Sequence, residues 1–370
     1  MPYFEIGYYG LIVIVFFMLI GDLYLRLPLL WSTDSNKTLK PSPPVSVIVC
    51  AQNEAANIGN LIDSLIKQDY PDFEIIIVND NSEDDTLEIV THFKKNHQNI
   101  QLINIFNEKP FGAGKKYPLS LGIKAAKHEL LLMTDADCLP ASSNWIKSMA
   151  ARYESSQMPI ILGYGGYTKT SGLTNLLTRF ETVQTALNYM GFAKKGKPYM
   201  GVGRNLLYSK AIWLKNNGFS SHMYVASGDD DLFIQEVANS QNTSYNIDPE
   251  SFTFSNSEKN ISDWNAQKGR HISTSSHYKF KFQFQLAAQF CIKVLFYLLL
   301  PFSLYNQNLI LSAAVFGSFI LIRTIVFYKS NKVFKGSIPL ILSPLISLLL
   351  VSFQMFIFIK NQFVKTNNWS

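Results

Sequence analysis

Apolar residues in this chain are gathered into a few long runs instead of being spread evenly. Residues 3–20 carry one charged side chain, Glu5, and the run is long enough to cross the roughly 30 Å hydrocarbon core of a bilayer as a helix. Three further runs, at residues 286–304, 309–328 and 338–359, meet the same length criterion. The sequence therefore predicts a membrane anchor within residues 1–30 and three membrane-spanning helices within residues 286–360, followed by a tail at 361–370.

The composition agrees with a membrane protein. Only 16% of the residues are charged, whereas soluble domains average about 25%. A disordered, collagenous or disulfide-stapled protein is excluded, and Cys50, Cys138 and Cys291 lack the paired spacing of a zinc site. A cleaved signal peptide is the alternative for the first run. No Lys or Arg precedes that run and no small-residue cleavage site follows it, so we favour a retained anchor.

Most of the lysines and arginines that flank the apolar runs lie on one side. They are Lys37 and Lys40 after the first run, Lys268, Arg270, Lys279 and Lys281 before the second, and Lys329, Lys332 and Lys335 between the third and fourth. By the positive-inside rule, we expect the central segment in the cytoplasm and both termini outside a plasma or inner membrane. Arg323 lies near the cytoplasmic end of its run, so we expect its side chain to snorkel rather than to act as a functional charge within the membrane.

The segment between the apolar runs is predicted to be an α/β domain. Prolines at 41, 43 and 44 mark residues 31–44 as an extended linker, and the domain follows at 45–285. Strands are expected at 45–51, 73–80, 100–106, 129–135 and 159–167, and helices at 55–68, 84–95, 115–127 and 142–155. Several strands are unbroken Ile, Val or Leu runs, which indicates burial on both faces of a mostly parallel, doubly wound sheet. Ligands of such sheets bind at the carboxyl ends of the strands.

Polar and acidic residues cluster where three of these strands end. Gln52, Asn53 and Glu54 follow the first strand, Asp80 ends the second, and Asp135 and Asp137 follow the fourth. A single aspartate in such a place is commonly a turn residue or a helix cap. Asp135 and Asp137 are one residue apart, and two carboxylates so close repel each other unless a cation or hydrogen-bond donors hold them. This pair therefore favours a Mg2+ or Mn2+ site over an ordinary acidic turn.

Two further groups are less specific when taken alone. The run of aspartates at 229–231 precedes a helical pattern and could be a solvated cap. The cluster at residues 267–271 could be a flank that obeys the positive-inside rule. No concentrated basic face with interleaved aromatic residues is present in the central segment, so nucleic-acid binding is not expected.

Taken in order, these groups resemble the family 2 inverting glycosyltransferases. The motifs are Gln52-Asn53-Glu54, Val78-Asn79-Asp80-Asn81-Ser82, Gly114-Lys115, Asp135-Ala136-Asp137, Gly201-Val202-Gly203-Arg204-Asn205, Gly228-Asp229-Asp230-Asp231-Leu232 and Gln267-x-x-Arg270. The chain is most similar to the membrane-anchored branch, which includes cellulose, hyaluronan and poly-N-acetylglucosamine synthases and ceramide glucosyltransferase. The resemblance covers the whole central segment.

The resemblance implies a role for each motif. Asp80 matches the residue that contacts the uracil of a nucleotide-sugar, with Gln52, Asn53 and Glu54 beside it, and Lys115 matches a basic residue near the nucleotide. Asp135 and Asp137 match the D-x-D pair, whose second member holds the metal. Asp229 or Asp230 matches the catalytic base. Gln267 and Arg270 match the Q-x-x-R-W element, which grips the diphosphate and lines the acceptor channel.

The chain departs from the family pattern at three positions. Asn79 replaces the first Asp of the uracil motif, and Gly228 replaces the Glu before the base, which leaves the base open between Asp229 and Asp230. His271 replaces the Trp that stacks on the growing acceptor, although a histidine could stack weakly, donate a hydrogen bond or simply lie at the surface. We therefore expect transfer of one or a few sugars from a UDP-sugar. A processive polysaccharide synthase and a non-catalytic scaffold remain as alternatives.

One more segment bears on the acceptor. Residues 173–199 mix large apolar side chains with lysines at 194, 195 and 197, which predicts an amphipathic helix at the membrane interface. A packed helix of the domain is the alternative. An interfacial helix beside the site favours a lipid, a lipid-linked or a short glycan acceptor that approaches along the bilayer.

Overall fold

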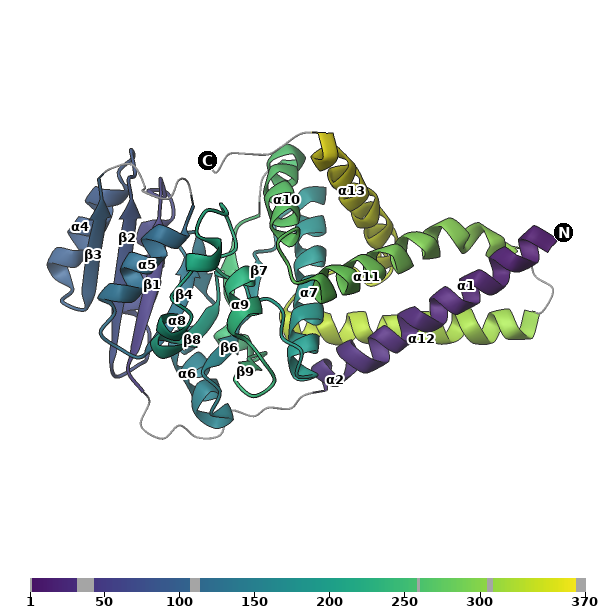
Figure 1. Ribbon diagram of the computed structural model, residues 1–370, viewed down its shortest axis with the longest axis horizontal. Helices are drawn as coiled ribbons and strands as arrows, with labels where there is room; N and C mark the ends of the chain where they lie inside the picture. Colours follow the sequence, from purple (N-terminus) through teal and green to yellow (C-terminus); the bar gives the residue numbers. More distant parts are fainter. Residues whose placement is uncertain (1, 32–42, 107–113, 258–259, 305–308, 364–370) are drawn as a thin grey trace.

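The computed structural model describes residues 2–31, 43–106, 114–257, 260–304 and 309–363, and among these it leaves the side chains of residues 2, 270–273, 303–304, 309 and 361–363 undescribed. Most of the predicted linker and the whole of residues 364–370 lie outside the described residues. The chain divides into a sheet domain and a set of long helices that extend from one side of it (Figure 1).

A mixed sheet of seven strands forms the centre of the sheet domain. Its order is β3-β2-β1-β4-β8-β6-β9. The strands are β1 (Val45–Ala51), β2 (Phe73–Asp80), β3 (Ile100–Ile105), β4 (Leu130–Asp135), β6 (Ile160–Leu162), β8 (Leu206–Ser209) and β9 (Thr243–Tyr245). The first four are parallel, and β8 runs antiparallel to β4 and β6. The α/β class and the mostly parallel sheet are therefore confirmed.

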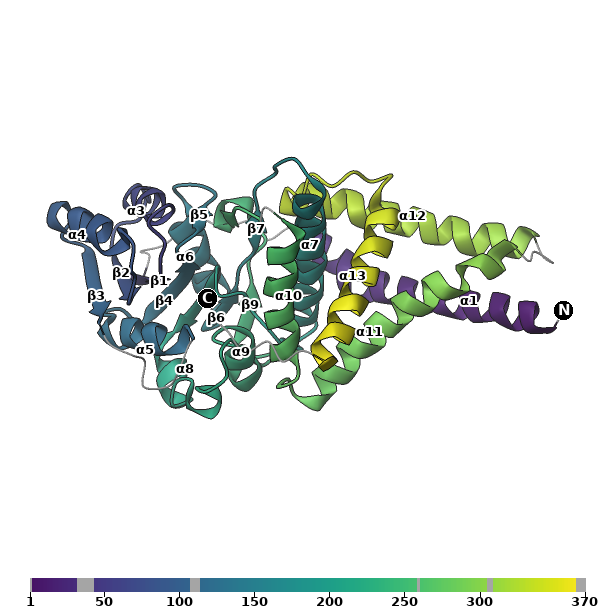
Figure 2. The same cartoon turned by 90° about the horizontal axis from the view of Figure 1, so that it is seen from above.

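Helices cover both faces of this sheet, as its continuous apolar strands require. Val45, Val47 and Val49 pack in one cluster with α3 (Ile58–Ile66), α4 (Thr86–Asn96) and α6 (Trp145–Ser156). On the other face, Ile48 packs with α5 (Lys116–Ala125). Gly122 permits that contact, because a Cβ there would lie 2.7 Å from the Ile48 side chain. The two layers of helices are separated by the sheet in Figure 2.

The predicted strand at 159–167 is wrong in one respect, because it is two strands in two sheets. After β6 the chain turns into β7 (Gly165–Tyr167), which joins a small sheet with β5 (Cys138–Pro140) and β10 (Thr253–Ser255). Asn205 causes the break. It is fully buried, its Nδ2 donates to the Tyr164 carbonyl at 2.8 Å, and a Cβ on Gly163 would lie 2.4 Å from its side chain.

The helix expected at 173–199 is α7 (Leu173–Lys194). Most of its side chains are buried, and it contacts β7 and β9 on the domain side and α12 and α13 on the other. Extensive burial agrees with the alternative prediction, a helix packed within the domain. Contact of α7 with a bilayer surface stays a prediction. The remaining short elements are α8 (Lys210–Lys215), η2 (Ser220–His222), α9 (Asp231–Val237) and η3 (Pro249–Ser251).

Within the described residues, four helical segments are long and apolar enough to cross a membrane: Tyr3–Leu30, Phe280–Phe302, Ile310–Phe334 and Ser343–Lys360. They are built from α1 (Pro2–Gly21), η1 (Asp22–Arg26), α2 (Leu27–Leu30), α11 (Phe280–Leu299), η4 (Leu300–Leu304), α12 (Leu309–Phe334) and α13 (Ser343–Phe363). A further helix, α10 (Ile261–Ser275), lies between these segments and the sheet domain (Figure 1). The expected apolar helices are thus present, while their orientation and the number that span a bilayer stay predictions.

Arg323 makes an ion pair that was not predicted, while the expectation that its side chain snorkels to the membrane surface stays a prediction. Its Nε lies 3.1 Å from Oδ2 of Asp22, which is fully buried on η1 and is also ion-paired with Arg26. The sequence contains no local sign of this pair, because Asp22 and Arg323 are brought together only by the packing of α12 against η1.

Candidate functional site

The acidic strand ends predicted from the sequence meet at the carboxyl edge of the parallel strands. Cys50 on β1 lies at the centre of this group, within electrostatic range of Asp80, Lys115, Asp135 and Asp229. Burial, opposed in part by Lys115, raises the pKa of its thiol to about 12. Residues as far apart in the sequence as Cys50 and Asp229 therefore share one region. The predicted convergence of these side chains is present in the structure.

The loops after β1 and β2 hold each other in place. Asn53 has a positive φ of 55°, which asparagine tolerates well, and its Oδ1 accepts a hydrogen bond from the Glu83 backbone N at 2.8 Å. In return, the Asn53 N donates to Ser82 Oγ at 3.0 Å. Asp80 is buried at the end of β2. Glu54 is itself partly buried, and this burial raises the pKa of its carboxyl group. The loop of residues 52–54 thus contacts the loop that follows Asp80, while the roles of Gln52, Asn53 and Glu54 stay predictions.

Lys115, just before α5, joins the strand ends to the acidic run that precedes α9. Its Nζ is ion-paired with Oδ1 of Asp135 and lies 3.9 Å from Oδ2 of Asp229. Burial acts to lower the pKa of Lys115, but the two carboxylates outweigh it and hold that pKa well above its usual value. Burial likewise acts to raise the pKa of Asp135, and Lys115 and Arg204 outweigh it, so Asp135 stays ionised.

Asp137 has the surroundings of a cation ligand. Oxygen atoms of Asp135 and Asp137 and the sulfur of Cys138 all lie within 4.8 Å of one another. Burial and the nearby charge of Asp135 raise the pKa of the Asp137 carboxyl, which a bound cation would reverse. Burial also raises the pKa of the Cys138 thiol well above its usual value, so it stays protonated and is a poor ligand. The two carboxylates therefore fit a hard divalent ion such as Mg2+ or Mn2+, with the other ligands supplied from outside the chain.

The three aspartates at the start of α9 have different surroundings. Asp230 is a helix cap: Oδ1 accepts from the Asp231 backbone N at 2.6 Å, and Oδ2 accepts from Gly203 N at 2.8 Å. Burial and the charges of Asp231 and Asp229 raise the pKa of Asp230 well above its usual value. Asp231 accepts from the Tyr278 hydroxyl at 2.6 Å. Asp229 has no hydrogen-bond partner among the described residues and faces Lys115.

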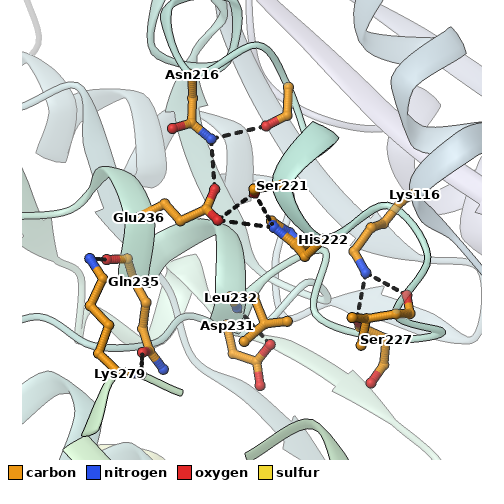
Figure 3. A network of polar contacts seen from close by, with 12 residues as sticks. Lys116, Asn216, Ser221, His222, Ser227, Asp231, Leu232, Gln235, Glu236 and Lys279 are labelled. Atoms are coloured by element: carbon orange, nitrogen blue, oxygen red, sulfur yellow. Dashed lines mark hydrogen bonds and ion pairs between the residues drawn. The ribbon is translucent and has the colours of Figure 1, made fainter. Parts of the chain in front are cut away.

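A polar network supports the segment that carries these aspartates (Figure 3). Lys116, only 2% exposed, donates from Nζ to the Val225 carbonyl at 2.6 Å and to the Ser227 carbonyl at 2.5 Å. Gly114 lies against the same segment, and a Cβ there would come within 2.8 Å of the Ala226 carbonyl oxygen. The segment before Asp229 is thus clamped by the residues that begin α5.

Figure 3 also shows how α9 itself is held. Glu236 accepts a hydrogen bond from Asn216 Nδ2 at 2.8 Å and contacts Ser221 Oγ and His222 Nδ1, so that α9 is tied to the preceding loop. Lys279, at the start of α11, donates from its backbone N to Gln235 Oε1 at 3.0 Å. These bonds join the acidic run to the helices beside the sheet domain.

The predicted Gln267, Arg270 and His271 lie on α10. The side chains of Arg270 and His271 are outside the described residues. Gln267 Oε1 is buried without a hydrogen-bond partner in the part of the chain that the structure describes. The C-terminal end of α10 reaches the acidic segment, because Thr274 Oγ1 contacts Ser227 Oγ. The element is therefore next to the site, while the roles of its residues stay predictions.

Two cationic residues near the site, Arg204 and Lys116, were not predicted as site residues. Arg204 was seen only as part of a motif, yet it stacks over the Tyr167 ring at 4.5 Å and interacts with the charges of Asp135 and Asp137. Gly165 leaves room for it, since a Cβ there would lie 2.5 Å from the Arg204 side chain. Lys116 was not considered because the pattern pointed to its neighbour. The Gly-x-Gly pattern before Arg204 could have identified that arginine as a site residue. No sequence pattern marks Lys116.

Comparisons with known proteins agree with this geometry. Residues 46–211 match the family described as glycosyl transferase family 2. Over 202 residues the chain is 26% identical to a poly-beta-1,6-N-acetyl-D-glucosamine synthase of Staphylococcus epidermidis, covering 52% of this chain and 44% of that protein. Over 301 residues it is also 26% identical to the probable glycosyltransferase YdaM of Bacillus subtilis, covering 76% of this chain and 67% of that one. The chain thus matches less than half the length of the synthase.

A solved structure shares the fold. The mannosyltransferase PcManGT of Pyrobaculum calidifontis, in complex with GDP-Man and Mn2+, aligns with a TM-score of 0.52 at 16% identity, over 91% of this chain and 99% of that one. At this identity the likeness concerns the fold alone. The family match and the strand-end aspartates lead to one conclusion: residues 46–211 of this chain are similar to glycosyl transferase family 2.

Proposed function

We propose that this protein is a membrane-bound, inverting glycosyltransferase that transfers a sugar from a UDP-sugar, with a divalent cation, to a lipid, lipid-linked or short glycan acceptor. One observation carries the proposal. Asp135, Lys115 and Asp229, from three distant parts of the chain, form a connected charged group beside Asp80 and Asp137. This group is attached to helices long and apolar enough to cross a membrane.

The donor side of the reaction needs positive charge. The leaving group is a nucleoside diphosphate, on which negative charge develops as the glycosidic bond breaks. A Mg2+ or Mn2+ ion on Asp137, with Asp135 beside it, would supply most of that charge when bound. Lys115 and Arg204 lie in the same region, and each remains protonated because nearby carboxylates or Tyr167 offset the effect of burial on its pKa. These fixed cations would orient the diphosphate before reaction.

The acceptor side needs a base, and the surroundings favour Asp229 over Asp230. A base must be ionised and free to take a proton, whereas the Asp230 carboxylate is occupied by two backbone N–H groups and has a raised pKa. Asp229 is available and is kept near the donor region by Lys115. Direct displacement of the diphosphate by the activated hydroxyl inverts the anomeric centre, so an α-linked donor would yield a β-linked product.

A donor screen tests the proposal. The full chain, purified in detergent, is incubated with UDP-glucose, UDP-galactose, UDP-N-acetylglucosamine or GDP-mannose and Mn2+ or Mg2+, and release of the nucleotide is measured. Turnover of one donor is expected, with loss of at least about a hundredfold in Asp137→Ala. Asp63→Ala, at an exposed position of α3, is the matched control and should keep full activity. Undiminished turnover in the Asp137 variant contradicts the metal role.

The same screen separates the alternatives. A processive synthase makes long products, which a gel resolves from single transfers, and His271→Trp should lengthen the product if the missing Trp limits processivity. Nucleotide binding without turnover of any donor would instead support a non-catalytic scaffold.

A further inference from the structure

A second charged cluster lies where the apolar helices join the sheet domain. Asp22 and Arg26 are on η1, Arg323 is on α12 and Lys293 is on α11. Asp22 is fully buried and Arg26 is 7% exposed. Asp22 is ion-paired with both arginines, and Lys293 interacts electrostatically with all three. The proposed function uses none of these residues.

Positive charge exceeds negative charge in this cluster. Beyond Asp22, the described carboxylate in range of Lys293 is Glu181 on α7, and that group is already ion-paired with Lys268 at 2.6 Å. Four cations therefore share two carboxylates: Arg26 and Arg323 both pair with Asp22, and Lys293 has no ion pair of its own in the described part of the chain. The Nε atoms of Arg26 and Arg323 are both buried and make no hydrogen bond there.

Among the described residues, the Phe319 ring, over which Arg323 lies at 5.5 Å, offsets this charge only in part. Leu11, Val15, Met18 and Phe296 form an apolar core between α1 and α11 on one side of the cluster. Unpaired charge in such a setting is costly, because neither apolar side chains nor lipid tails replace the water and counter-ions lost on burial. An anion bound among these cations would offset the excess of positive charge.

The depth of the cluster indicates where that anion comes from. Lys195 lies over the Tyr24 ring at 4.3 Å, and Lys329 lies over the Trp31 ring at 4.0 Å. Half-exposed aromatic rings paired with lysines are typical of the level of the lipid headgroups. Tyr24 is two residues from Asp22 on the same η1 segment. The cluster is thus about one helical turn from headgroup depth, within reach of a lipid phosphate.

We propose that Arg26, Lys293 and Arg323 form a binding site for the phosphate group of an anionic lipid. Guanidinium groups suit phosphate oxygens because their N–H donors form paired, charge-assisted hydrogen bonds, and the ammonium of Lys293 adds a third cation. Asp22 holds the two arginines in place between the helices. The inference rests on the membrane placement in the proposed function, but not on glycosyl transfer.

Lipid binding to the full chain in detergent tests the site. Thermal unfolding is followed with added dioleoylphosphatidic acid, dioleoylphosphatidylcholine, dodecyl phosphate or inorganic phosphate, without any sugar donor. Phosphatidic acid is expected to raise the unfolding midpoint more than phosphatidylcholine. Dodecyl phosphate should act similarly if one chain suffices. Equal protection by inorganic phosphate, or none by phosphatidic acid, would overturn the lipid site.

Three variants locate the effect. Lys293→Met is expected to weaken the apparent affinity for phosphatidic acid by roughly tenfold or more, since it removes one charge-assisted contact. Lys293→Arg keeps the charge and should keep the response. Lys329→Met removes a lysine at the same membrane level but outside the cluster, so it should respond like the unaltered chain.

An unchanged response in Lys293→Met contradicts the site. Should that variant not fold, native mass spectrometry of lipid bound to the unaltered chain decides the question: preferential retention of phosphatidic acid over phosphatidylcholine supports the site, and equal retention contradicts it. Because no donor is present, loss of lipid binding and loss of transferase activity are observed separately.

Discussion

The sheet domain and the apolar helices each hold a buried charged cluster, and the two are unbalanced in opposite directions. At the strand ends, Asp80, Asp135, Asp137 and the aspartates at 229–231 outnumber Lys115, Lys116 and Arg204. Around η1, the cations outnumber Asp22 and Glu181. An excess of carboxylates suits a metal and a base, whereas an excess of cations suits a phosphate.

The two regions differ in the kind of ligand that can reach them. The strand ends lie at an edge of the sheet, where a soluble donor and a hydrated cation can arrive together. The η1 cluster is enclosed by apolar helices, where a ligand must bring its own apolar part. The comparison teaches that net local charge, and not the presence of charge alone, distinguishes the two kinds of site.

The largest expected effect tests the division of labour among the acidic residues. Asp229→Asn should lower transfer by about 10²- to 10⁴-fold because it removes the proposed base, and its cost in stability should be small because Lys115 keeps its ion pair with Asp135. Asp230→Asn should chiefly lower the free energy of unfolding, by about 1 kcal/mol, since it weakens a cap. Transfer rates and denaturant unfolding check both. The reverse pattern would assign the base to Asp230.

The second prediction concerns the excess of cations around η1. Asp22→Asn removes the carboxylate that Arg26 and Arg323 share and should lower the free energy of unfolding by roughly 3 kcal/mol, as for other broken buried pairs. Lys293→Met should have the opposite sign and raise the unfolding midpoint in lipid-free detergent, because it removes an uncompensated charge. Thermal unfolding of the two variants provides the measurement. Destabilisation by both would mean that the cluster is already balanced.

A smaller effect is expected at the clamp on the acidic segment. Lys116→Met removes the two hydrogen bonds that hold residues 225 and 227, so the turnover number should fall several-fold, with little change in donor affinity. Lys124→Met, at an exposed position on the same helix, is the matched control. Initial rates at varied donor concentration separate the two parameters. A change confined to donor affinity would contradict a positioning role.

The smallest expected effect is a dependence of metal affinity on pH. The pKa of Asp137 is raised, so protons compete with Mn2+, and affinity should fall as the pH drops through that raised pKa. Asp135 has a lowered pKa and stays ionised over the same range. Titrations of Mn2+ in the presence of UDP, between about pH 5 and 8, should show this slope, and Asp137→Asn should flatten it. An identical slope in that variant would exclude Asp137 as the titrating ligand.

Much of the sheet domain could be predicted, for a physical reason. β1 and β2 begin and end at the predicted residues, because long Ile and Val runs bounded by polar turns have few other ways to be buried. The strand-end position of Asp80, Asp135 and Asp137 followed from the same reasoning, since all parallel strands end at one edge. The split of 159–167 into two strands did not, because it depends on Asn205, which lies some forty residues further along.

The sequence alone determined where this protein is apolar, where its strands run and which acidic residues can meet, since those properties follow from local periodicity and from the rules of parallel sheets. Only the tertiary structure decided that Asp230 is a cap while Asp229 faces Lys115, and that Arg323 is ion-paired with Asp22. The physical reason is that the charge a side chain carries, and the work it can do, depend on its neighbours in space, which the order of residues along the chain does not reveal.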